Sequence, residues 1–321
     1  MMEKGHSRDS SRSNIDTIPQ SLDTRVGRQP PRRKRLPPCP SDIPPTGVPF
    51  PKGAERFQII DSHCHIYPEK IAAKAVAGTD TFYDTVAKCD GTAASLLQIN
   101  EEVGIDHSLV QSVATTPKQV QSINHFIAET VAASNGKLTG LGTLHPDSED
   151  QRADVRHLVD LGLKGVKLHP DIQQFKIDDY RCLKIYELCE EYGLPILMHT
   201  GDKRYDFSNT NRLIPILETY TNLTIIGAHM GGWSLWEEAS LQLAGTPNLY
   251  VDCSSTMSWV PLDKTAEIIR RYGADRVLFG TDYPMWHPKD ELEMFFNLGL
   301  TDDEMKLILS ENVKKIYGLS L

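Results

Sequence analysis

The sequence predicts an α/β fold, a (β/α)8 barrel of the TIM type that follows an N-terminal extension. Short runs rich in β-forming residues alternate with segments of helical periodicity from residue 57 onward, which is typical of parallel strands joined by helical crossovers. Eight such runs occur, and a closed barrel of this kind requires eight. No Gly-x-Gly-x-x-Gly motif follows the first run, which argues against a doubly wound open sheet.

The N-terminal segment, residues 1–53, is expected to be a disordered tail, and residues 54–321 are expected to form the barrel. The tail is rich in Ser, Pro and Arg and has almost no periodic apolar residues, so it cannot bury enough surface to offset the entropy lost on ordering. It contains the basic stretch PPRRKRLPP. A solvated basic segment is the favoured interpretation, and a nuclear address or nucleic-acid patch is the alternative.

Composition excludes several classes of protein. Hydrophobic residues make up 40% and charged residues 24% of the chain, as in soluble globular proteins. The net charge is -9 although the first fifty residues are basic, so the barrel is acidic and nucleic acid is not its expected ligand. No run is long enough for a membrane span and no secretory signal is recognisable. Six cysteines without a Cys-x-x-Cys pair indicate reduced thiols and a cytoplasmic location.

The eight strand-like runs are found in order along the chain. They span residues 57–61, 107–113, 138–144, 165–168, 195–198, 223–228, 248–253 and 276–280. Segments between them carry apolar residues at i, i+3 and i+4, often with Gly or Asn at the C-terminal side, and so predict helices. The clearest are residues 122–134, 153–162, 183–193, 211–220 and 264–273.

Polar residues follow these runs repeatedly, and the C-terminal ends of the strands are where a TIM barrel builds its active site. The residues at these ends are His63 and His65 (first run), His145 (third), Lys167 and His169 (fourth), His199 (fifth), His229 (sixth) and Asp282 (eighth). Alternate residues of a strand share a face, so His63 and His65 should both point into the barrel mouth and Cys64 should point away.

This gathering of imidazoles and a carboxylate predicts a metal site. Buried imidazoles without partners would be costly, and neutral imidazole with carboxylate suits one Zn2+, with Mn2+ and Fe2+ as alternatives. An open coordination position would hold a water.

Five segments together resemble the amidohydrolase superfamily, in particular its amidohydrolase-related branch, which includes the aminocarboxymuconate-semialdehyde decarboxylase group. They are IIDSHCHIYP, KGVKLHPD, ILMHTGD, IIGAHMGG and LFGTDYP, and the resemblance covers residues 57–318. The resemblance implies a metal-dependent TIM barrel that acts on small molecules. It implies that His63, His65, His199 and Asp282 hold the metal, that His229 assists the bound water, and that Asp282 is both ligand and catalytic base.

Lys167 has two interpretations. In two-metal members of the superfamily a carboxylated lysine at the end of the fourth strand bridges two ions, which would give this chain a second ion shared by His199 and His229. The favoured expectation is one ion, with Lys167 as a buried ion-pair or substrate partner. His169 lies two residues further along the same face and is a second candidate for substrate contact.

Other substrate contacts are expected in the loops. Arg204 and Tyr205 follow the fifth run and could hold a substrate carboxylate or ring. Trp286, after the eighth run, could form part of a pocket wall, although buried packing explains a tryptophan equally well.

The function expected first is hydrolysis of an amide, lactone or related bond in a small molecule by a metal-activated water. Non-oxidative decarboxylation of an unsaturated or aromatic carboxylate is the alternative on the same fold, because the branch that the chain resembles contains decarboxylases. An inactive barrel that serves as a binding scaffold is the alternative from another class. The expected partner is a small-molecule substrate, and a homodimer is implied by the family alone.

Overall fold

The computed structural model describes residues 56–321. The predicted tail and its PPRRKRLPP stretch lie outside the described residues.

Each of the eight predicted runs overlaps a strand, and the first strand extends to His65, four residues beyond its predicted run. The strands are β1 (Ile60–His65), β2 (His107–Gln111), β3 (Leu138–Gly140), β4 (Gly142–Thr143), β5 (Val166–Leu168), β6 (Ile196–Met198), β7 (Ile225–Gly227), β8 (Leu249–Asp252) and β9 (Val277–Leu278). The third run contains both β3 and β4, which are separated by Leu141 alone. All neighbouring strands pair in parallel.

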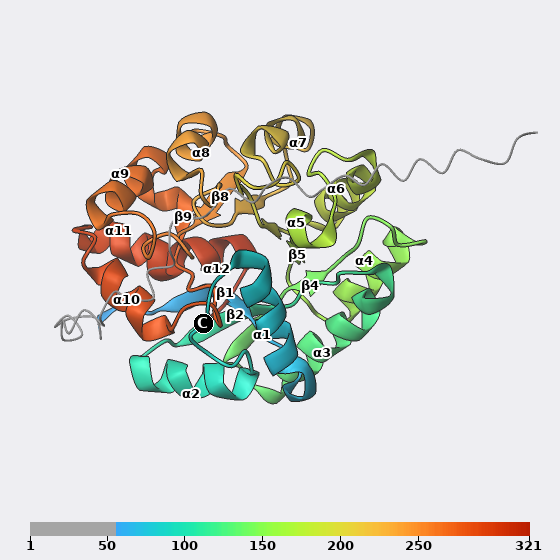
Figure 1. Cartoon of the computed structure of the whole chain (residues 1–321), viewed down its shortest axis with the longest axis horizontal. Helices are drawn as coiled ribbons and strands as arrows, with labels where there is room; N and C mark the ends of the chain where they lie inside the picture. Colours follow the sequence, from blue (N-terminus) through green and yellow to red (C-terminus); the bar gives the residue numbers. More distant parts are fainter. Residues whose placement is uncertain (1–55) are drawn as a thin grey trace, which may run out of the picture. The chain divides into compact units, whose positions relative to one another are not determined.

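The strands form two sheets, β1–β2–β3 and β4 to β9, and backbone hydrogen bonds join them at both junctions. At one junction the Leu141 N–H donates to the Val110 carbonyl at 2.9 Å. At the other, the Ser62 N–H donates to the Phe279 carbonyl at 2.9 Å and the Asp282 N–H donates to the His63 carbonyl at 2.9 Å. The predicted barrel fold is therefore confirmed, and Figure 1 shows its strands in the middle of the view with helices around them.

Helices follow the strands, as the alternating pattern predicts. They are α1 (Glu69–Tyr83), α2 (Ala93–Val103), α3 (Val120–Ala133), α4 (Gln151–Asp160), α5 (Pro170–Gln173), α6 (Tyr180–Tyr192), α7 (Ile214–Thr219), α8 (Trp236–Leu243), α9 (Leu262–Tyr272), α10 (Pro288–Phe296), α11 (Asp302–Lys306) and α12 (Asn312–Tyr317). Short turns of other helical types are η2 (Pro117–Gln119), η3 (Thr210–Arg212), η4 (Ala274–Arg276) and η5 (Leu307–Glu311).

The sequence fixes several helix ends locally. Asp150 and Asp179 begin α4 and α6 by accepting backbone N–H bonds from Ala153 and Arg181, which satisfies donors that have no partner within the helix. Gly193 ends α6 in the left-handed conformation that glycine adopts without steric cost. None of the helices in residues 56–321 is long and apolar enough to cross a membrane.

Side chains alternate between two cores along the strands. In β6, Leu197 belongs to the cluster inside the barrel, while Ile196 and Met198 pack in the larger cluster between strands and helices. Lys167 is in register with Leu197, so the lysine occupies a position inside the barrel that its neighbour fills with an apolar residue. Cys64 belongs to the outer cluster, which leaves His63 and His65 on the inner face as predicted.

Candidate metal centre

His63 and His65, at the end of β1, face each other across a short gap. Their Nε2 atoms are 3.2 Å apart. The Oδ1 atom of Asp282, after β9, lies 3.3 Å from Nε2 of His63 and 3.7 Å from Nε2 of His65. Asp282 therefore converges with the two histidines although it lies more than two hundred positions from them in the chain. The three residues form one of the groups whose ligand atoms could share a metal ion.

Asp252 at the end of β8 orients the His63 ring. Its Oδ2 atom lies 2.9 Å from Nδ1 of His63, and both side chains are fully buried. Its Oδ1 atom accepts backbone N–H bonds from His229 and Ser254, each at 3.0 Å. Because a carboxylate only accepts hydrogen bonds, Nδ1 of His63 carries the proton and Nε2 presents a lone pair to the gap. A carboxylate behind a histidine is the usual partner of a metal-binding imidazole.

Asp282 is held by a second pair of side chains. The Ser255 hydroxyl donates to Asp282 Oδ2 at 2.6 Å, and the Trp286 Nε1–H donates to the Ser255 hydroxyl at 2.7 Å. Oδ1 is thereby left to face the histidines. Burial raises the pKa of the Asp282 carboxyl, so a proton or a nearby cation is favoured on this group.

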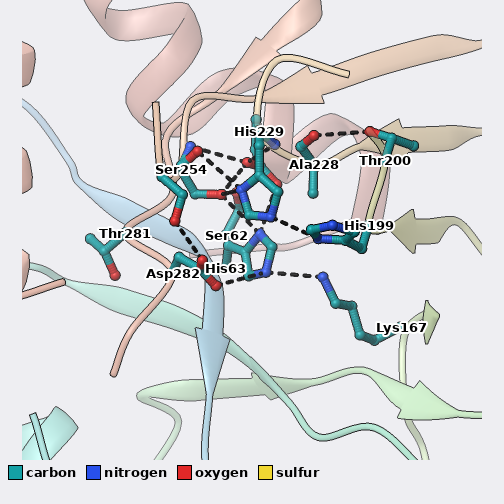
Figure 2. Close-up of polar contacts among 12 residues, drawn as sticks. Ser62, His63, Lys167, His199, Thr200, Ala228, His229, Ser254, Thr281 and Asp282 are labelled. Atoms are coloured by element: carbon teal, nitrogen blue, oxygen red, sulfur yellow. Dashed lines mark hydrogen bonds and ion pairs between the residues drawn. The ribbon is translucent and has the colours of Figure 1, made fainter. Parts of the chain in front are cut away.

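His229 lies between Ser254 and His199. Nε2 of His229 lies 3.1 Å from Nδ1 of His199, and Nδ1 of His229 lies 2.9 Å from the Ser254 hydroxyl. Burial lowers the pKa of His229 to about 4, so the ring is neutral near pH 7. Figure 2 shows this chain from Ser254 through His229 to His199, with His63 and Asp282 beside it.

His199 also belongs to a second group of metal-type ligands, with His169 and Asp171. Its Nε2 atom lies 3.5 Å from Asp171 Oδ2, and its ring stacks on His169 with centroids 4.0 Å apart. The Tyr83 hydroxyl lies 2.7 Å from Nε2 of His169. The structure thus brings all four predicted ligands to one rim, but His199 reaches the other three through His229, and its role as fourth ligand stays a prediction.

Lys167 contacts the group formed by His63, His65 and Asp282 through His63. Its Nζ atom is 3.0 Å from Nε2 of His63, and the residue is fully buried. Burial lowers the pKa of the Lys167 amine, and the carboxylates of Asp282 and Asp252 oppose that effect. The position fits the favoured expectation of a buried partner of the site, and the alternative of a carboxylated lysine between two ions stays a prediction.

The donor set fits a divalent cation. Two imidazole nitrogens and one carboxylate oxygen point at one another from within 3.7 Å. Burial, followed by the charge of Lys167, lowers the pKa of His63 and of His65, so both rings are neutral and have the lone pairs that coordination requires. Neutral imidazole and carboxylate suit Zn2+, Mn2+ and Fe2+ alike.

The ligand group opens into a cavity of about 540 Å3. Its walls include aromatic side chains from five segments, namely Phe82 and Tyr83 of α1, Phe126 of α3, Trp233 after β7, Trp259 after β8, and Trp286 after β9. Lys167, His169, His199 and His229 line it too. The predicted contacts Lys167, His169 and Trp286 thus line the cavity, and their direct contact with substrate stays a prediction.

Arg204 and Tyr205 lie outside the cavity lining. They are not among the described residues that line the cavity. The Arg204 guanidinium pairs with the buried carboxylate of Asp202 at 2.7 Å, donates to the Phe82 carbonyl at 2.9 Å, and lies 5.2 Å from the Tyr83 ring centroid. The Tyr205 ring stacks on Phe82. These two residues therefore pack against Phe82 and Tyr83, which line the cavity. Their direct contact with substrate stays a prediction.

The sequence interpretation missed Asp252, Ser255, Asp171 and Tyr83. Asp252 is the last residue of β8 and lies one residue before the end of the seventh run, so the rule that selected the histidines, a polar residue at a strand end, would have found it. Asp171 lies two residues after His169, and the same rule extended into the loop would have included it. Nothing in the sequence places Tyr83, because it reaches the site from the C-terminal end of α1.

Unusual backbone conformations gather in the same loops. His229, Ser255 and Asp282 all have positive φ angles, of 58°, 47° and 59°. Such conformations are unfavourable for residues other than glycine and cluster at functional sites, where the surrounding structure holds them.

Comparison with known proteins agrees with this architecture. The family model described as Amidohydrolase matches residues 60–319, and no curated protein matches the chain. Among solved structures, an uncharacterised TIM-barrel protein from Bordetella bronchiseptica has a TM-score of 0.69 at 23% identity and covers 82% of this chain and 99% of its own.

Two further structures are similar at lower identity. The 5-carboxyvanillate decarboxylase of Sphingomonas paucimobilis has a TM-score of 0.64 at 15% identity, covering 82% of this chain and 100% of its own. A dihydroxybenzoic acid decarboxylase of Polaromonas, with bound manganese and the inhibitor 2-nitroresorcinol, has a TM-score of 0.62 at 16% identity, covering 82% and 97%. At these identities the likeness concerns the fold, whereas the family model spans most of the chain. The chain therefore belongs to the amidohydrolase family and has its TIM-barrel fold.

Proposed function

We propose that this protein is a metal-dependent, non-oxidative decarboxylase that acts on an aromatic or unsaturated carboxylate. The observation that carries the proposal is the cavity, whose lining joins His65 and Asp282 of the ligand group with seven Phe, Tyr and Trp side chains. A planar ring can pack against these side chains while its carboxylate reaches the polar end. The decarboxylases of Sphingomonas and Polaromonas, the latter with manganese, support the proposal.

The reaction breaks the bond between the ring carbon and the carboxylate, releases CO2, and leaves the electron pair on the ring carbon, which then takes a proton. No water is consumed. A divalent cation, when bound by His63, His65 and Asp282 with His199 as the predicted fourth ligand, supplies positive charge that attracts an anionic substrate. Lys167 and His199 are also at most 2% exposed, and screening from bulk water strengthens electrostatic interactions there.

Two groups of this chain are placed to move the proton. Asp282 lies at the cavity wall, and its Oδ2 accepts from Ser255 while Oδ1 faces the histidines, so that its carboxylate can pass a proton to the ring carbon. His229 lines the same cavity, and its neutral ring can accept a proton. These are the two residues expected from the sequence to be catalytic.

Hydrolysis is the second candidate. The observation that favours it is the position of His229, which lines the cavity and lies 3.1 Å from His199, because an imidazole beside a metal-bound water can take its proton. It ranks below decarboxylation because the cavity wall is aromatic and the named structural neighbours are decarboxylases.

The two candidates make opposite predictions about solvent. Full-length protein loaded with Mn2+, and separately with Zn2+, is incubated with 2-hydroxybenzoate and 2,6-dihydroxybenzoate in D2O, and with aromatic esters, amides and lactones in 18O-labelled water. Decarboxylation gives CO2 and a ring that carries deuterium at the vacated carbon. Asp282→Asn should abolish this turnover, whereas the exposed His125→Ala should not change it. Incorporation of 18O into a product, with no CO2 from any acid, would establish the hydrolase instead.

A further inference from the structure

We propose that the substrate carries, away from its carboxylate, an uncharged and largely apolar substituent that packs against one particular wall of the cavity. This wall, called here the α1–α3 wall, consists of Ile71, Ala75 and Gly78 of α1 and Ile123 and Phe126 of α3. The inference rests on the proposed function, because it assumes that the carboxylate lies at the ligand group. It names the class of substrate that the cavity selects.

The volume of the cavity exceeds what a single ring needs. A cavity of about 150 Å3 lined by apolar side chains accommodates benzene, whereas the cavity here measures about 540 Å3. Space remains open beside α1, since a Cβ atom added at Gly78 would meet no atom within 4 Å. A one-ring acid held at the ligand group would therefore leave most of the cavity to water.

Charge is confined to one end of the cavity. Among its described lining residues, Lys167 and Asp282 bear the only charged side chains apart from histidines. Lys167 is held 3.0 Å from His63, and Arg204 is paired with Asp202 outside the lining. A second carboxylate on the substrate would lose part of its hydration at the α1–α3 wall and meet no cation, which is unfavourable.

The α1 side of this wall is an apolar surface without a protein partner of its own. In the described structure Ala72 is the one buried residue of α1. Ile71 lines the cavity and yet remains 49% exposed. A ligand substituent that covers Ile71 and Ala75 would remove apolar surface from water, which is worth about a fourfold gain in affinity for each methylene buried.

The test measures binding rather than turnover. Isothermal titration calorimetry with Mn2+-loaded full-length protein compares benzoate, 3- and 4-propylbenzoate, and the dicarboxylates isophthalate and terephthalate. A propyl group at the better of the two positions is expected to tighten binding up to about 50-fold relative to benzoate. Both dicarboxylates are expected to bind more weakly than benzoate.

A charge placed in the wall should reverse this preference. Ala75→Lys supplies the missing cation, so propylbenzoate should lose affinity and a dicarboxylate should gain it. Ala77→Lys is the matched control, because Ala77 is exposed on the same helix and does not line the cavity; it makes the same change of net charge and should leave the preference as it was.

The outcomes separate the two proposals. If propylbenzoate binds more tightly than benzoate but no acid releases CO2, the substrate class stands and the decarboxylase proposal fails. If hydroxybenzoates release CO2 but a propyl group brings no gain, or dicarboxylates bind as tightly as benzoate, the inference about the α1–α3 wall is overturned. Equal effects of Ala75→Lys and Ala77→Lys would overturn it as well.

Discussion

Replacing Asp252 by Asn should weaken metal binding without removing any ligand. The two side chains have the same shape, so Oδ1 of the amide can keep the backbone N–H bonds from His229 and Ser254. The amide nitrogen must then replace Oδ2, which lies 2.9 Å from Nδ1 of His63. Because an amide nitrogen only donates hydrogen bonds, His63 must accept at Nδ1 and move its proton to Nε2. An Nε2–H facing His65 at 3.2 Å cannot bind a metal.

The size of the effect follows from the role of the carboxylate. Loss of a partner behind a metal-binding histidine typically reduces metal affinity by about 10- to 100-fold, which corresponds to about 1.4 to 2.7 kcal/mol. The upper end is expected here, because His63 and Asp252 are both fully buried and water cannot take the place of the lost acceptor.

The assay is titration of the protein with Mn2+, followed by the electron paramagnetic resonance signal of the free ion. Asp61→Asn is the matched control. Asp61 is equally buried on β1 and loses the same charge, but its carboxylate accepts from Thr281 and from the backbone N–H of His63 instead of from an imidazole. If both variants changed the Mn2+ dissociation constant equally, control of the His63 proton by Asp252 would be refuted.

Two further predictions concern stability. Glu291 is fully buried, and burial raises its pKa well above 4.5. The folded state therefore binds the Glu291 proton more tightly than the unfolded state does. The resulting stabilisation of the fold is present below about pH 4.5 and is lost as the pH rises through the folded-state pKa. Glu291→Gln should accordingly be more stable than the unmodified protein at pH 8, with no difference at pH 4 in urea denaturation. Arg204→Met should lower the free energy of unfolding by about 3–5 kcal/mol, because it leaves the carboxylate of Asp202 buried without its partner. Adding Asp202→Asn to Arg204→Met should restore part of this free energy. Equal stability of the single and the double variant would contradict this explanation.

The fold could be predicted from the sequence because its signals are local. Each strand run is short and rich in β-forming residues, and side chains of β6 such as Leu197 and Met198 are divided between the two cores by simple alternation. Seven helices lacked so clear a pattern, among them α1, which buries Ala72 alone in the described structure. A helix that covers a cavity rather than a core has little reason to show a regular apolar stripe.

By itself, the sequence determined the barrel and the identity of the polar residues at its rim, because both depend on residue type and on position relative to a strand end. The tertiary structure alone decided how these residues pair. Whether Asp252 or water stands behind His63, and whether Arg204 faces the cavity or Asp202, depends on angles and distances between strands far apart in the chain. A hydrogen bond requires its donor and acceptor to lie about 3 Å apart. The order of residues in the sequence does not specify which side chains come that close, whereas closure of the barrel does.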